Sequence, residues 1–112
     1  MGIKVTNLED EIVLISLEGR LDSDAALKID DKFVFATSTK KANVIVDLSE
    51  VSFIASMGLR TLVAGARNQA NRGGKLVLLN PQEMVRKVIE TTGLDPHLPI
   101  FNDIESAKLA FA

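Results

Sequence analysis

Residues 44–62 read VIVDLSEVSFIASMGLRTL, and this stretch decides the fold. The unbroken apolar run at 44–48 predicts a central strand that is buried on both faces. After a turn, apolar residues return at helical spacing, which predicts an amphipathic helix that begins near Ser56. A buried strand that leads directly into an amphipathic helix is the repeating unit of an α/β fold.

The flanking sequence continues this alternation in both directions. Further strands are expected at 3–6, 12–17, 75–79 and 98–101, the last at an edge because proline lacks a backbone donor. The first two strands suggest an antiparallel hairpin, and the strand–helix–strand repeats favour parallel pairing with right-handed crossovers. We expect one α/β domain over residues 1–112, a mixed sheet of four to five strands with about four helices in the order β-β-α-β-α-β-α-β-α.

Turn and cap residues predict where these elements begin and end. The second strand is expected to close at Glu18 and Gly19, and the glycines Gly73 and Gly93 are expected to end two helices. The first helix has an apolar stripe, which predicts its core-facing side at Ala26, Ile29, Phe33 and Ala36. Helix caps are expected at Asp22 or Ser23, Ser56, Asn80 and Asn102.

Composition excludes several classes of function. The chain has 112 residues, 46% of them hydrophobic, and a formal net charge of −2, so no basic field favours nucleic acid or an acidic membrane surface. It has no cysteine and one histidine, so neither a thiolate nor a multi-histidine metal site is expected, and no cofactor is implied. We see no signal peptide and no apolar run long enough to span a membrane, and we therefore expect a cytoplasmic protein.

Catalytic motifs are also missing from the sequence. No phosphate-binding loop and no G-x-G-x-x-G follows a strand, and Ser56 does not lie in a G-x-S-x-G elbow. A nucleophilic serine needs a base within reach, and no pattern links the distant His97 to Ser56. We therefore expect no enzyme; a small hydrolase that uses Ser56 is the weaker reading.

Ser56 lies where the second helix must start, and two roles fit that position. Backbone N–H groups are unpaired at a helix start, and a serine hydroxyl can cap them. A phosphate at the same place would meet the positive end of the helix dipole. The residues alone leave open whether Ser56 is a structural N-cap or a chemical switch, and we expect Gly58 to keep the surface beside it open.

A second stripe runs along the same helix, apart from its core-facing residues. It combines apolar, basic and small side chains, a mixture that can form a docking surface or can be plain helix exterior. Its large apolar member would either cover the end of the core or make a flexible contact with a partner. The stripe comprises Met57, Arg60, Thr61, Ala64 and Asn68.

Taken together, these motifs resemble the STAS family, whose best-known small members are bacterial anti-sigma factor antagonists. Residues 17–22, LEGRLD, are similar to the family's G-x-L-D strand end, and 46–54, VDLSEVSFI, resemble its D-L-S-x-V-x-F stretch. Residues 56–59, SMGL, fall on its phosphoacceptor turn, and GGKL at 73–76 and the segment 81–94 complete the order. The similarity extends over nearly the whole chain.

The resemblance implies partner switching in the control of transcription. The unmodified protein would bind an anti-sigma factor that is also a serine kinase and so free a sigma factor. Phosphorylation of Ser56 would block this binding, and a serine phosphatase would restore it. The partner-binding residues are then expected to be Asp22, Ala55, Met57, Gly58, Arg60, Thr61, Ala64 and Asn68.

Two residues depart from the family pattern. The family usually has an aspartate before the acceptor, where this chain has Ala55, and a second hydroxyl residue after it, where this chain has Met57. The turn is therefore more apolar than usual. The alternative is a non-phosphorylated STAS interaction module that serves a signalling complex or a lipid-transport assembly.

Overall fold

The computed structural model describes residues 2–38, 43–94 and 96–111. These residues form five strands and four helices in the expected order, and a single 3-10 turn at Glu9–Glu11 joins the first two strands. The elements are β1 (Gly2–Asn7), β2 (Ile12–Leu21), α1 (Ser23–Thr37), β3 (Asn43–Ile54), α2 (Ser56–Asn71), β4 (Lys75–Leu79), α3 (Glu83–Thr91), β5 (Ile100–Phe101) and α4 (Ile104–Leu109).

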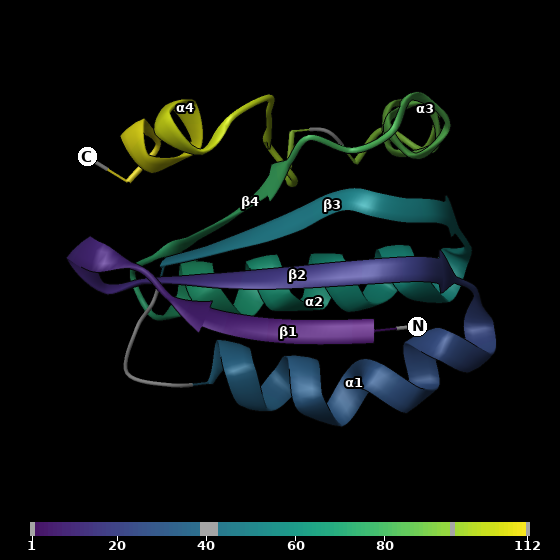
Figure 1. The fold of residues 1–112 in the computed structure, drawn as a ribbon, viewed down its shortest axis with the longest axis horizontal. Coiled ribbons are helices and arrows are strands. Elements are labelled where there is room, and N and C mark those ends of the chain that lie inside the picture. The colour runs from purple at the N-terminus through teal and green to yellow at the C-terminus, as the bar shows by residue number, and fades with distance from the viewer. Residues whose placement is uncertain (1, 39–42, 95, 112) are drawn as a thin grey trace.

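The five strands form one mixed sheet, as expected. Their order is β1-β2-β3-β4-β5, with β1 antiparallel to β2 and every later neighbour parallel (Figure 1). β5 lies at the edge, as predicted, but it has two residues instead of four. Pro99 precedes it, and the Pro99 carbonyl still accepts a bond from the Leu78 N–H.

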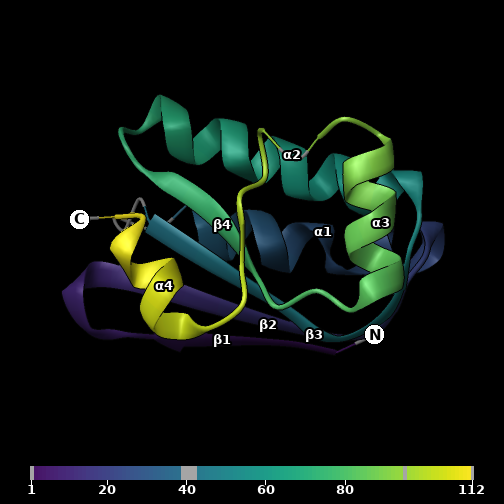
Figure 2. The same ribbon diagram turned by 90° about the horizontal axis from the view of Figure 1, so that it is seen from above.

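Helices cover the sheet on both faces. α1 and α2 pack side by side on one face, where they enclose the larger core with alternate residues of β2, β3 and β4 (Figure 1). α4 covers the other face, where Ala107 meets Ile45 and Val77. α3 packs beside β3, and in Figure 2 it crosses near the start of α2. The run at 44–48 therefore contributes to both cores, which confirms its predicted burial on both faces.

The apolar stripe of α1 is confirmed. Its four predicted members are all buried, and the Asp22 carboxylate accepts a 2.9 Å bond from the Ala25 N–H, as an N-cap does. At its other end, the Thr37 carbonyl accepts bonds from Gln69 of α2 and from Arg72, the C-cap residue of α2. Hydrogen bonds thus hold both ends of α1, and those at its C-terminal end join it to the C-terminal end of α2.

The predicted end of β2 was wrong. The strand continues through Gly19 to Leu21, with register shifts against β3 just before Glu18 and just after Gly19. Gly19 adopts φ +100°, a conformation that favours glycine, and the shifts mark a bulge in the pairing. The bulge carries β2 onward, so that Leu21 pairs with Ile54 at the end of β3.

Two predicted caps were also wrong. Asn80 lies before the cap of α3, in the left-handed region at φ +49°, and Gln82 takes the N-cap position, its side-chain amide donating to the Ser49 carbonyl. α4 is capped by Asp103 instead of Asn102, and a bond from the Ser106 N–H lowers the pKa of that carboxyl. The expected helix ends at Gly73 and Gly93 are confirmed by φ values of +83° and +74°.

Candidate functional site

Ser56 is the first residue of α2, and its side chain is exposed. The N-cap is Ala55, whose backbone is extended and whose side chain makes no capping bond. The prediction that Ser56 is the N-cap was therefore wrong by one residue. Its hydroxyl makes no hydrogen bond to any other described residue, so it is open to solvent and to a modifying enzyme.

The paired ends of β2 and β3 hold this position. The Ala55 N–H donates to the Leu21 carbonyl at 2.9 Å, so both strands deliver their helices to the same end of the sheet. The first backbone bond of α2 runs from the Leu59 N–H to the Ala55 carbonyl. The N–H groups of the residues before Leu59 have no partner within the helix, and together with the dipole they favour negative charge at Ser56.

Asp22 lies close to this end of the sheet, directly after Leu21, but its carboxylate is engaged in capping α1. The structure thus brings two of the predicted partner-binding residues, Asp22 and Ala55, to neighbouring strand ends. The starts of α1 and α2 therefore lie next to each other, at the carboxyl ends of two paired inner strands.

Gly58 does not open the surface beside Ser56, and that prediction was wrong. The residue is buried, and a Cβ placed on it would lie 2.7 Å from Leu21 Cγ and 3.0 Å from Ile54 Cγ1. Such distances are shorter than van der Waals contact. The absence of a side chain therefore allows the first turn of α2 to rest on the ends of β2 and β3.

The second stripe of α2 is only partly exposed. Arg60, Ala64 and Asn68 are exposed, whereas Thr61 is 8% exposed and its hydroxyl donates to the Met57 carbonyl at 3.1 Å. The expectation that Thr61 faces outward was wrong. Met57 is half-buried and packs against the core, which is the covering role considered for it.

Beside Ser56, two adjoining hollows of about 390 and 400 Å³ run along α2. Val63, Arg67 and Leu94 line both, so they form one continuous surface. We call it the α2 groove; Ser56, Arg60 and Thr92 line one end, and His97 lines the other.

Sequence reasoning missed much of the α2 groove. The seven-residue spacing of Arg60 and Arg67 is visible in the sequence and places both on one side of the helix. Thr92 and Leu94 carry no such signal, because they reach the groove only through the packing of α3.

Few ionisable side chains line this position among the described residues. His97 lines only the far hollow, and no acidic side chain lines either hollow among the residues that the structure describes. In the same part of the chain, no group of three or more His, Cys, Asp or Glu side chains is placed to hold a metal ion. None of the described helices is long and apolar enough to cross a membrane.

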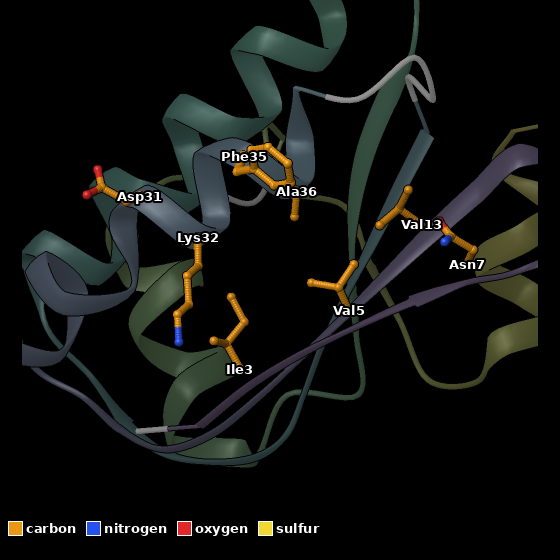
Figure 3. A pocket seen from close by; sticks show the side chains of 8 residues that line it. All are labelled: Ile3, Val5, Asn7, Val13, Asp31, Lys32, Phe35 and Ala36. Atoms are coloured by element: carbon orange, nitrogen blue, oxygen red, sulfur yellow. The ribbon is translucent and has the colours of Figure 1, made fainter.

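A separate hollow of about 510 Å³ lies between β1 and α1 and shares no residue with the α2 groove. Figure 3 shows Ile3 and Val5 rising from β1 toward α1, where Lys32 extends over Ile3 and Ala36 closes the far wall. Its rim includes Phe35, which is 78% exposed. This hollow lies at the β1 edge of the sheet, away from the end at which α2 starts.

Comparison with known proteins matches residues 4–107 to the family model described as STAS domain. The anti-sigma F factor antagonist of Lysinibacillus sphaericus is 33% identical over 97 residues, which are 86% of this chain and 83% of that protein. The Bacillus cell fate determinant SpoIIAA, solved in its phosphorylated form, is 26% identical with a TM-score of 0.73 over 97% of both chains. An anti-sigma factor antagonist from Mycobacterium paratuberculosis has the same fold, with a TM-score of 0.86 at 24% identity over 98% of this chain and 92% of that one.

Proposed function

The chain belongs to the STAS domain family, and we propose that it is an anti-sigma factor antagonist switched by phosphorylation of Ser56. In this proposal the unmodified protein binds an anti-sigma factor with serine kinase activity, and the phosphorylated protein does not. A serine phosphatase returns it to the binding form. The protein is then a regulatory binding protein and the substrate of an enzyme, not an enzyme itself.

One observation carries the proposal: Ser56 is an exposed, unengaged hydroxyl at the first position of a helix whose N-cap residue, Ala55, is hydrogen-bonded to the end of β2. A kinase can reach such a hydroxyl without unfolding the protein. The relative from Lysinibacillus sphaericus is named an anti-sigma F factor antagonist, and SpoIIAA has been solved in a phosphorylated form. Both relatives support the proposal that this fold serves here as an antagonist regulated by phosphorylation.

Electrostatics supports a switch that acts on binding and leaves the fold intact. A phosphate adds roughly −1.5 to −2 charges and three strong acceptor oxygens. At a helix start these charges are favoured by about 0.3–1 kcal/mol, so the modified protein stays folded. A partner that docks over Ser56 would instead meet a bulky, hydrated dianion. The modification would therefore weaken docking without damaging the domain.

Phosphorylation itself is tested by intact mass after incubation with ATP and the recombinant anti-sigma factor kinases of the same organism. We expect one added phosphate on the wild-type protein and none on Ser56→Ala. Ser52→Ala is the matched control, because Ser52 is also exposed and lies only four residues earlier, in β3. It should be phosphorylated like the wild type. Phosphate on Ser56→Ala would assign the acceptor elsewhere.

Binding is tested with substitutions at the same residue. Ser56→Asp should weaken binding to the anti-sigma factor by at least about tenfold, because a carboxylate places negative charge where the partner docks. Ser56→Ala should bind like the wild type. Titration calorimetry with all three proteins gives the comparison. Equal affinities for the aspartate and wild-type proteins would refute the switch.

A constitutive interaction module is the second candidate. Ala55 favours it, because this N-cap residue has no carboxylate that could help to orient a kinase and its nucleotide. Half-buried Met57 makes the same turn apolar. An unchanged mass after kinase treatment, together with tight binding to a partner, would favour this module over the switch.

A further inference from the structure

The charges that line the α2 groove are all of one sign. Arg60 and Arg67 are its charged side chains among the described residues, and neither makes a hydrogen bond or ion pair with another described residue. α2 itself contains both arginines and no acidic residue. The protein as a whole has a net charge of −2, so this positive groove is a local exception.

Apolar side chains form the floor between the two arginines. Val63 and Leu94 are half-buried, pack against the core and line both hollows. Leu59 closes the floor at the Ser56 end and is 6% exposed. An apolar floor with basic side chains at its margin matches a segment that has one apolar side and acidic residues beside it.

The distance between the two arginines sets the distance expected between the acidic residues of the partner segment. Seven residues separate Arg60 from Arg67, which corresponds to roughly 10.5 Å along the axis of α2. Two carboxylates that are also about two turns apart on a partner helix would match this separation. Arginine pairs with carboxylates in a two-bond geometry, which adds orientation to attraction.

We propose that the α2 groove is the docking site for an acidic amphipathic helix of the anti-sigma factor, with its carboxylates on Arg60 and Arg67 and its apolar side on Val63 and Leu94. The inference rests on the proposed function and names the chemistry of the partner segment. The proposed docking surface lies on the side of α2 that faces α3. The stripe predicted from the sequence instead included the side of α2 that carries Asn68.

The same arrangement explains how a phosphate on Ser56 would interrupt docking. Ser56 and Arg60 are four residues apart, line the same hollow, and therefore lie on the same side of α2. A phosphate on Ser56 would attract the Arg60 guanidinium and would repel the acidic helix from that end of the groove. Modification would thus replace the partner's carboxylate with a phosphate on the protein's own chain.

The test is a charge reversal at the arginine that is remote from Ser56. Arg67→Glu should weaken binding to the recombinant anti-sigma factor by about tenfold or more, and the loss should shrink as salt is raised. Lys87→Glu is the matched control, because it makes the same change in net charge at an exposed residue of α3 outside the groove. It should bind like the wild type. Thermal unfolding of each variant verifies that the fold is intact.

Ser56→Asp in the same titration separates the two proposals. Loss of binding by Ser56→Asp, with Arg67→Glu as tight as Lys87→Glu, would overturn the groove and leave the switch standing. Loss of binding by both Ser56→Asp and Arg67→Glu supports both. A wild-type protein that binds no anti-sigma factor would overturn the proposed function and the groove with it. Recovery of Arg67→Glu binding by an acid-to-arginine change in the partner would be the most direct support.

Discussion

Replacing Phe33 by alanine is expected to lower the free energy of unfolding by about 3–5 kcal/mol. Phe33 is 1% exposed and lies in the larger core, where α1 packs against α2. Its ring approaches α2 so closely that a Cβ at Gly65 would lie 2.8 Å from Phe33 Cε1. Removing the ring leaves a cavity between two helices that are fixed at their ends and cannot close it fully. Domains of this size are stable by only about 5–15 kcal/mol, so the loss is severe.

Phe35 provides the matched control, two residues further along α1. It is 78% exposed at the rim of the hollow beside β1 (Figure 3). Phe35→Ala removes the same ring from the same helix, and we expect a change within about 0.5 kcal/mol. Urea unfolding followed by circular dichroism measures both variants. Similar losses at the two positions would contradict the packing described here.

The elements that could be predicted from the sequence are those with a local signal. The period of α1 placed Phe33 and its stripe correctly, because a helix with one buried side must repeat its apolar residues at helical spacing. The run at 44–48 was also placed correctly, because a strand covered on both faces has no polar side. Gly73 and Gly93 correctly predicted where α2 and α3 end, because glycine readily adopts the left-handed conformation that follows a helix.

Features that depend on tertiary pairing could not be predicted. β2 passes its expected stop at Gly19 because β3 offers it a partner as far as Ile54. Thr61 looked like an exterior residue, yet its hydroxyl bonds within α2 to the Met57 carbonyl, and this allows its burial. The α2 groove needs Leu94, which arrives from beyond α3 and has no sequence signal that links it to Ser56.

The expected effect of Gly58→Ala on stability has one sign if Gly58 is exposed and the opposite sign if it is packed against its neighbours. Glycine in an exposed helix costs about 1 kcal/mol relative to alanine, so an open position would be stabilised by Gly58→Ala. The close approach to Leu21 and Ile54 reverses the sign, because both side chains are buried and neither can move away freely. The direction of the change therefore distinguishes an open surface from a packing contact.

Gly58→Val is expected to lower the free energy of unfolding by about 1–3 kcal/mol, since the added methyl groups must displace Leu21 or lift the first turn of α2. Ala64→Val is the control: it puts valine in the exposed part of the same helix, at a cost of only a few tenths of a kcal/mol. Urea unfolding gives both values, and a stabilised Gly58→Val protein would refute the contact. Because Ser56 lies two residues before Gly58, lifting this turn also moves the proposed acceptor hydroxyl. The folded fraction of Gly58→Val should therefore be phosphorylated more slowly than the wild-type protein, although both retain Ser56.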